Sequence, residues 1–180
     1  MEISSLFTDH MVLQNQKATP IWGWAKSGDE ISVKFNPGKS CKNKKQTKTT
    51  ITGKNGKWCV SLDPMSISTI SAELVVQSKS GEKLNVTDIL IGEVWLASGQ
   101  SNMEWIVQNS LNSEKEIETA KWPHIRMFSV PRYTDDKPVK NVKAKWKVCS
   151  PETVGNFSAV GYFFAREIHK AQKTPVGILN

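Results

Sequence analysis

The sequence predicts a β region followed by an α/β region: a small antiparallel sandwich joined to the first part of a parallel sheet with crossover helices. Two observations predict this fold class. Up to about residue 91, short segments alternate between apolar and polar residues and are separated by turn signals. Beyond residue 88, buried strands alternate with helical periodicity. We therefore expect a β-sandwich-like domain over residues 1–90 and an α/β domain over residues 91–180.

Period-two patterns mark the strands of the first region. Ile31, Val33 and Phe35 alternate with polar residues, and residues 58–62, 74–76 and 84–89 repeat the pattern. This spacing is typical of strands with one buried face. Gly-containing breaks at residues 27–29, 36–38, 55–56 and 80–81 separate these runs, and Asn-Gly suits the positive φ values of a tight hairpin turn.

The second region opens with a nearly continuous apolar run. Residues 89–97 predict a strand buried on both faces, ended by Ser98-Gly99. Ser113 and Glu116 have the spacing of a capping box, so we expect a helix to begin near Ser113 and to close at Trp122-Pro123.

Two more strands and one long helix complete this pattern. Residues 125–130 predict a strand, with a shorter strand at 146–148, and residues 176–179 predict the last strand. Between them a helix is expected with Ser158 as N-cap. Its predicted apolar stripe consists of Val160, Phe164, Ile168 and Ala171. Strand, helix, strand, helix, strand is the order of an α/β sheet.

The chain ends on the residue after its last predicted strand. Catalytic groups in such sheets lie in loops beyond the carboxyl ends of the strands. The sequence supplies about three strands, fewer than a stable doubly wound sheet usually has. We therefore expect the chain to be the N-terminal, truncated part of a larger protein.

Composition excludes several classes of protein. Lys and Arg total 24 against 17 Asp and Glu, a net charge of +7, and the mixture of charges argues against disorder. No apolar run is long enough for a membrane helix, and the first residues resemble no signal peptide, although one can have been removed. We expect no membrane partner, and the composition leaves the compartment open.

Five lysines crowd residues 39–48. They predict either an anion or nucleic-acid patch, or a solvated sheet edge protected from pairing with another chain. No aromatic residue lies between Lys39 and Lys57, so stacking platforms for bases are missing. We favour the sheet edge and expect no nucleic-acid partner.

The cysteines and tryptophans each leave two interpretations. Cys41 and Cys59 can form a disulfide if their strands are adjacent, but we favour free thiols, with Cys59 half-buried. Three cysteines are also too few for a zinc site. The seven tryptophans are either sugar-stacking platforms or core residues, and we expect most in the core. Trp105 is a candidate wall of a sugar site.

The segment that carries chemistry is Glu93–Trp105. A buried strand runs into Gly99, which is expected to let the backbone turn sharply, and Ser101 follows at the opening of a helical turn. There a hydroxyl is exposed and backbone N–H groups can face a developing negative oxygen. Met103 stands where the G-x-S-x-G elbow needs glycine, so this is a different motif. Taken alone, the pattern leaves a helix cap as the alternative to a nucleophile.

Here the sequence resembles a known family. Gly92–Met103 is similar to the nucleophile block of the sialate O-acetylesterases, a branch of the SGNH (GDSL-like) hydrolase superfamily. The resemblance continues, in order, through Phe7–Gln14, Ile21–Ala25, Asn55–Trp58, Leu62–Met65, Cys149–Thr153, Phe157–Ala165 and Pro175–Ile178. Residues 39–48 are the stretch without a match.

The resemblance implies an esterase that removes O-acetyl groups from sialic acids or other sugars, with no metal or organic cofactor. It implies a β-sandwich-like domain before an α/β/α domain, Ser101 as nucleophile, the N–H of Ser101 as one oxyanion donor, and a periplasmic or secreted location. The alternative is a non-catalytic module that binds glycan or a partner chain.

The family's Asp-x-x-His pair does not occur in this sequence, and neither does its Trp-Gly-Gly stretch. As substitutes, His10 is expected to be structural, His124 to lie on a connection, and His169 to be exposed on the long helix. We therefore expect the 180-residue chain alone to be inactive, with the missing C-terminal part of the catalytic domain as its partner.

Overall fold

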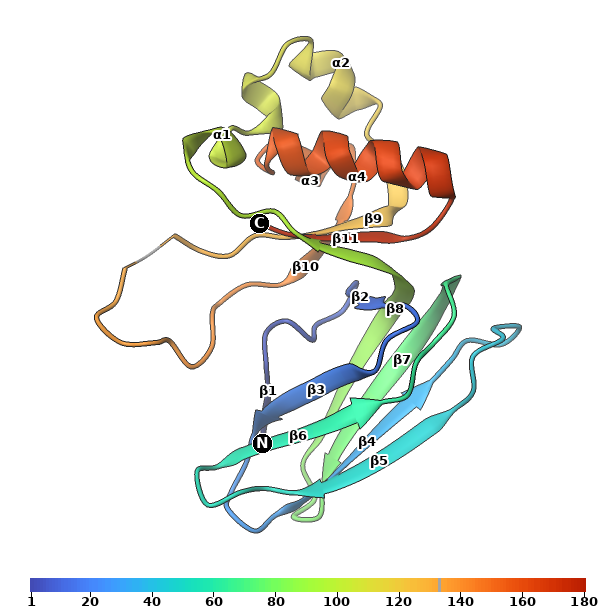
Figure 1. Cartoon of the computed structure of the whole chain (residues 1–180), viewed down its shortest axis with the longest axis vertical. Helices are drawn as coiled ribbons and strands as arrows, with labels where there is room; N and C mark the ends of the chain where they lie inside the picture. Colours follow the sequence, from blue (N-terminus) through green and yellow to red (C-terminus); the bar gives the residue numbers. More distant parts are fainter. Residues whose placement is uncertain (133) are drawn as a thin grey trace.

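The computed structural model describes residues 1–132 and 134–180. Figure 1 shows one part made of strands and a second part in which helices lie over one face of a sheet, with β8 running from the first part into the second. The fold is thus mixed α/β and mostly sheet, as the sequence predicts at this coarse level.

Within the described residues, the smaller sheet has three strands in the order β1-β3-β6, and both pairings are antiparallel. These strands are β1 (Glu2–Ile3), β3 (Thr19–Trp24) and β6 (Lys57–Leu62).

The larger sheet has the order β10-β9-β11-β8-β7-β4-β5 in the described residues, and β2 also pairs with β8. The pairs β8–β7, β7–β4 and β4–β5 are antiparallel, whereas β11 is parallel to both β8 and β9. Its strands are β2 (Val12–Gln14), β4 (Glu30–Asn36), β5 (Gln46–Ile51), β7 (Ser68–Ser78), β8 (Lys83–Leu96), β9 (Trp122–Phe128), β10 (Trp146–Cys149) and β11 (Val176–Leu179).

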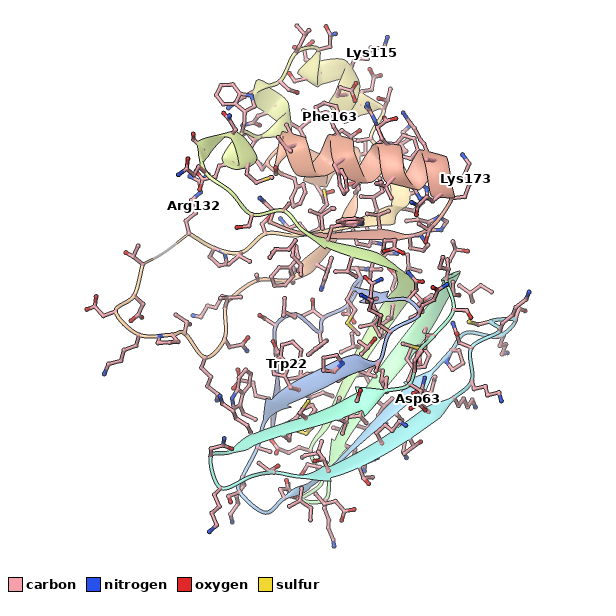
Figure 2. All side chains as sticks on the ribbon, in the orientation of Figure 1. Trp22, Asp63, Lys115, Arg132, Phe163 and Lys173 are labelled. Carbon is pink, nitrogen blue, oxygen red and sulfur yellow. The ribbon has the colours of Figure 1, made fainter. Side chains whose placement is uncertain are left out.

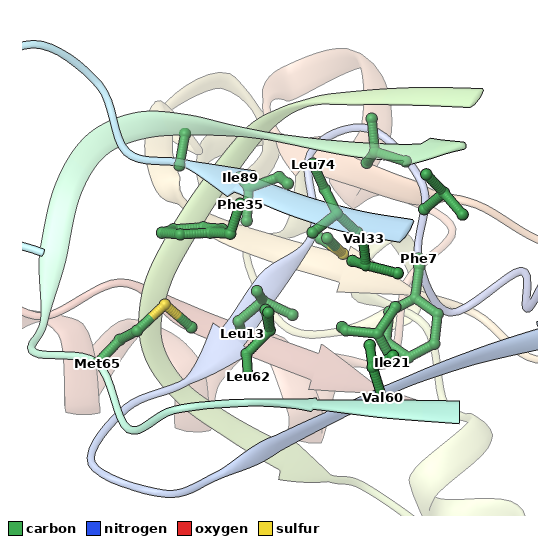
Figure 3. Packing of buried hydrophobic residues seen from close by; sticks show 14 of the residues in the cluster. Phe7, Leu13, Ile21, Val33, Phe35, Val60, Leu62, Met65, Leu74 and Ile89 are labelled. Carbon is green, nitrogen blue, oxygen red and sulfur yellow. The ribbon is translucent and has the colours of Figure 1, made fainter. Parts of the chain in front are cut away.

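Side chains from both sheets form one apolar core (Figure 3). In β4, Ile31, Val33 and Phe35 are fully buried while their neighbours are not, so the predicted period of two is confirmed. In β6, Val60 and Leu62 face the same core. The hairpin turns also follow the sequence, because Gly28, Gly56 and Gly81 all have positive φ.

β8 joins the two parts of the chain. The division expected at residues 90 and 91 falls inside this strand and stays a prediction. Residues 89–92 are buried as predicted, but the carboxyl end of the strand is not, since Trp95 is 43% and Leu96 74% exposed. The expectation that both faces are buried to Ala97 is therefore wrong. Beyond Gly92, β8 pairs with β11, while the side chain of Gln14 accepts from the backbone N–H of Val94 and donates to the carboxylate of Glu93.

The helices are α1 (Ser101–Glu104), α2 (Ser113–Glu118), α3 (Pro151–Val154) and α4 (Ala159–Gln172), with a 3-10 turn at Val107–Asn109. The capping box expected at Ser113 is wrong. Asn112 is the N-cap of α2, in a left-handed conformation, and Glu116 pairs with Arg166 of α4 at 2.5 Å. The capping box lies instead at the start of α3.

The boundaries around β9 also differ from the prediction. The helix α2 ends at Glu118, and Trp122-Pro123 opens β9 rather than closing a helix. The strand ends at Phe128, two residues earlier than expected, and β10 extends one residue further, to Cys149.

The long helix α4 begins at the predicted place, but its buried face is not the predicted one. Ser158 is the N-cap, and its Oγ accepts a hydrogen bond from the N–H of Gly161 at 3.1 Å. Val160 and Phe164 of the expected stripe are 47% and 40% exposed, whereas Tyr162 and Ala165 are buried. A Cβ at Gly161 would lie 3.3 Å from the side chain of Ile178 in β11, so the glycine lets this face of the helix approach the sheet.

Replacing Ser158 by alanine should lower the free energy of unfolding by about 1 kcal/mol, because the N–H of Gly161 then loses its capping acceptor. Urea denaturation measures the change. The control Ser71→Ala, at an exposed position of β7, should change stability by less than about 0.5 kcal/mol. Equal losses in the two variants would contradict the capping role.

The lysine-rich stretch leads into the edge of the larger sheet. β5 is the last strand of the sheet order, and Lys48 forms an ion pair with Asp63 at 2.7 Å. This agrees with the sheet-edge interpretation of residues 39–48.

The three cysteines are free. The expected half-burial of Cys59 is wrong, because its side chain is exposed on the polar face of β6, while Cys149 is buried and burial raises the pKa of its thiol to about 12. The tryptophans also differ from expectation: Trp58 and Trp146 are fully buried, and the other five are at least partly accessible, Trp105 at 55% and Trp95 at 43%.

A buried arginine ties β9 to β8. The guanidinium of Arg126 donates to both carboxylate oxygens of Asp88, at 2.7 and 3.2 Å, and to the backbone oxygens of His10 and Pro123. His10 Nδ1 lies 2.6 Å from the same carboxylate. Burial by itself would raise the pKa of Asp88, but the hydrogen bonds from Arg126 and His10 outweigh burial and lower it. Asp88 has a left-handed backbone, with φ of 53°.

Candidate active site

Ser101 lies at the start of a short helical turn that follows strand β8. β8 ends at Leu96, and Ser101 is the first residue of α1 after an extended Gln100. Ser101 is exposed, and the backbone N–H groups of Ser101 and Asn102 have no acceptor among the described residues. The structure thus gives this serine a solvent-accessible position at the carboxyl end of a strand parallel to β11.

Gly99 does not act through an unusual backbone conformation. Its φ is not positive, and the expected sharp turn at this glycine stays a prediction. A Cβ at this position would lie 3.2 Å from the Cβ of Met103. The glycine therefore makes room for α1 to fold back on the strand end.

Contacts with the start of α4 hold α1 in place. Ser158 Oγ donates to the sulfur of Met103 at 3.5 Å, and the N–H of Ala159 donates to the carbonyl oxygen of Trp105 at 2.7 Å. The indole Nε1 of Trp105 donates to the carbonyl oxygen of Asn109 at 3.0 Å. The position of Ser101 is therefore set by a segment more than fifty residues away in sequence.

A pocket of about 260 Å³ lies next to this turn. Its walls come from α1, from the segments that follow β8, β9 and β11, and from the segment before α4. Gly99 and Met103 line it, whereas Ser101, which lies between them in sequence, does not. Asn180 connects the strand ends, since its backbone N–H donates to the carbonyl oxygen of Phe128 at 2.9 Å and its side-chain amide donates to that of Ala97 at 3.1 Å. This is the edge at which parallel sheets place their ligands.

Sequence reasoning missed most of the pocket wall. The residues it did not propose for the site are Ile106, Ser129, Val130, Arg132, Asn156 and Asn180, and Ser158 was proposed only as a cap. Ser129 and Asn180 directly follow strands, and polar residues at that place are a signal that could have found them. Arg132 and Asn156 come from connections, where no local pattern marks them.

Two charged side chains line the pocket. Glu104 of α1 pairs with Arg132 at 3.1 Å, and both are solvent-exposed. Figure 2 labels Arg132 on the connection that follows β9, on the same side of the molecule as α1. Because Glu104 is held by this cation, it is a poor candidate for a general base toward Ser101.

None of the three histidines lines this pocket. His10 is bound to Asp88, which precedes Leu96 by eight residues, or roughly 26 Å of strand. His124 lies within β9, not on a connection as expected, near the amino end of that strand. Burial lowers the pKa of His124, and the imidazole of His169 lowers it further.

His169 is only partly exposed, so the expected full exposure on the helix is wrong. Its Nδ1 lies 2.7 Å from the carbonyl oxygen of Thr174, and its ring packs edge-on against Trp122 and His124. Trp122 opens β9, at the opposite end of that strand from Phe128 beside the pocket. The structure therefore does not bring any histidine to Ser101.

Within residues 1–132 and 134–180, no group of three His, Cys, Asp or Glu side chains has the arrangement of a metal site. In the same residues, no helix is long and apolar enough to span a membrane.

The chain resembles known proteins in both sequence and structure. No family model matches the sequence. The sialate O-acetylesterases of Rattus norvegicus and Homo sapiens are each 30% identical over 98% of the chain, which covers 34% and 36% of their respective lengths. The crystal structure of a carbohydrate acetylesterase from Xanthomonas citri superposes with a TM-score of 0.86 at 34% identity, over 99% of this chain and 39% of that one.

The chain is homologous to the sialate O-acetylesterases. The resemblance found in the sequence is confirmed, and the mixed α/β fold matches that of an acetylesterase. The homologous region spans about a third of the length of the curated relatives.

Proposed function

We propose that this protein is a serine esterase of the SGNH type that removes O-acetyl groups from sialic acid or another acetylated sugar, with Ser101 as its nucleophile. The observation that carries the proposal is the exposed hydroxyl of Ser101 at the end of β8, beside a pocket at the carboxyl ends of parallel strands. The names of the homologues supply the substrate class, an acetylated carbohydrate.

The chemistry would proceed through an acetyl-enzyme. Oγ of Ser101 attacks the acetyl carbonyl carbon as a base accepts its proton, and the resulting oxyanion lies near the free N–H of Ser101. Collapse breaks the ester bond, and the leaving sugar oxygen takes up the proton that the base had accepted, which releases the sugar with a free hydroxyl. Water then attacks the acetyl group and regenerates the serine, so acetate is the second product.

The base has to come from outside these 180 residues. The histidines lie elsewhere in the fold, and Glu104 is paired with Arg132. We therefore propose that the chain carries the nucleophile and part of the pocket, and that a further segment or partner chain completes the site. The alternative function, a glycan- or partner-binding β module without catalysis, predicts that Ser101 is never activated.

Covalent labelling separates these alternatives. The protein expressed from its complete reading frame should react with a fluorophosphonate at Ser101, because only an activated serine reacts at an appreciable rate. Peptide mapping locates the adduct, and release of acetate from acetylated sialic acid or acetylated xylan identifies the substrate. A protein that stays unlabelled at Ser101 and releases no acetate would favour the binding module.

A further inference from the structure

Two tryptophans lie side by side on the outer face of the smaller sheet. Trp22 and Trp24 alternate along β3 with residues that face the core, and across the ladder they pair with Cys59 and Lys57 of β6. Both indoles are partly accessible. An edge-to-face contact with Phe7, at a centroid distance of 4.6 Å, fixes the ring of Trp22. Figure 2 labels Trp22 beside β3.

These indoles line a pocket of about 490 Å³, which we call the tryptophan pocket. The wall of this pocket also includes Trp58, Asn55, Lys57 and Lys140. The volume falls within the range of small-molecule sites. The tryptophan pocket shares no lining residue with the pocket beside Ser101, so it is a separate site.

Gly23 lets the side chain of Trp58 pack on the core face of β3, opposite the face that carries Trp22 and Trp24. A Cβ at Gly23 would collide with the ring of Trp58, so only glycine lets Trp58 lie across β3 at this point. Trp58 is 2% exposed and belongs to the apolar core. The strands that carry Trp22 and Trp24 are therefore anchored from behind by the apolar core.

The exposed polar groups in this wall are the ammonium groups of Lys57 and Lys140 and the side-chain amide of Asn55. The indole N–H groups of Trp24 and Trp58 are buried, so they are not open to a ligand. The ammonium of Lys140 lies 4.6 Å from the ring centre of Trp24 and 3.2 Å from a carboxylate oxygen of Glu2. Lys57 has no ion-pair partner among the described residues. A ligand that suits this wall presents a flat apolar face and many acceptor oxygens.

We propose that the tryptophan pocket is a saccharide-binding site, distinct from the catalytic site, in which a pyranose ring displaces the ammonium of Lys140 from the ring of Trp24 and stacks there. A pyranose combines a C–H-rich face, which packs on an indole, with ring and hydroxyl oxygens that accept from Lys57 and Asn55. The site would hold a glycan on the β unit without hydrolysing it. This proposal does not require Ser101 to be catalytic.

Isothermal titration calorimetry of the 180-residue chain with xylohexaose and with sialyllactose tests the proposal. We expect at least one of them to bind with a dissociation constant of at most about 1 mM. Trp24→Leu keeps apolar bulk but removes the aromatic face, and should weaken binding at least about 10-fold. Trp24→Phe should weaken binding less. The control Trp95→Leu, at an exposed tryptophan outside this pocket, should leave affinity unchanged.

A second measurement needs no substitution. Cys59 lines the tryptophan pocket and is exposed, so bound saccharide should slow its reaction with a maleimide while the reaction of Cys41 is unaffected. The absence of binding to either saccharide overturns the proposal. Binding that survives in Trp24→Leu and leaves Cys59 unprotected also overturns it. Loss of binding in Ser101→Ala would place the saccharide in the catalytic pocket instead.

Discussion

The 180-residue chain and its Ser101→Ala variant should hydrolyse p-nitrophenyl acetate at the same background rate. In a longer protein that also supplies the base, the same substitution should lower kcat on the order of 10⁶-fold. The physical reason is the position of the candidate bases. A serine hydroxyl is a weak nucleophile until an adjacent base accepts its proton. In the chain described here His10 and His169 are both held elsewhere.

The comparison needs a matched serine variant. Ser61 is exposed on β6, away from the pocket beside Ser101, so Ser61→Ala should retain full activity in the completed protein. The measurement is steady-state release of p-nitrophenol by each variant, with circular dichroism to verify the fold. Turnover by the 180-residue chain that disappears in Ser101→Ala would show that a local base exists, and would overturn the proposed incomplete site.

Replacing Asp88 by asparagine should lower the free energy of unfolding by about 3 kcal/mol, because it leaves the charge of Arg126 buried without its counter-charge. The side chain of Arg126 is 4% exposed and cannot turn to water without opening β9. In the variant, Arg126 keeps its hydrogen bonds to the backbone oxygens of Pro123 and His10. The expected loss of stability therefore lies at the lower end of the range for a broken buried ion pair. Asparagine also tolerates the left-handed backbone of Asp88, so the substitution removes charge without adding strain.

Chemical denaturation at several pH values tests this expectation. The pKa of Asp88 is below its ordinary value of 3.8 in the folded protein, so its stabilising contribution is complete above that value and is lost as pH falls through the lower folded pKa. The difference between wild type and Asp88→Asn should therefore shrink below about pH 4.

A surface pair provides the control. Lys79 and Glu30 lie 3.8 Å apart and are both well exposed, so Lys79→Met should cost less than about 1 kcal/mol. If Asp88→Asn costs no more than Lys79→Met, the buried arginine does not depend on this carboxylate and the proposed role of the network is wrong.

Local patterns predicted the elements whose formation depends on their own residues. The alternation in β4 and β6 and the glycine turns were correct, because one buried face imposes a period of two and positive φ favours glycine. The N-cap at Ser158 was correct for the same local reason. The similarity of Gly92–Met103 and its flanking motifs to the sialate O-acetylesterases can also be recognised from the sequence.

Long-range packing decided the predictions that were wrong. The buried face of α4 contains Ala165 and Gly161, which lies against Ile178 of β11, whereas Phe164 stays 40% exposed although it fits the 3.6-residue period equally well. Glu116 was expected to cap α2, but its carboxylate contacts Arg166 in another helix. Trp95 belongs to an apolar run yet remains 43% exposed, although its ring packs edge-on against Phe164 of α4 at a centroid distance of 5.1 Å.

The sequence by itself determined that the chain is an acetylesterase homologue of mixed α/β fold, and it singled out one serine. These properties depend on contiguous motifs and short periodicities, which can be recognised without the structure. Only the tertiary structure decided what surrounds that serine and what lies far from it. The pocket wall draws on strand ends and connections from residues 97–180, and the tryptophan pocket combines β3, β6 and Lys140. Such neighbours are brought together by sheet pairing and burial, which no local pattern of residues encodes.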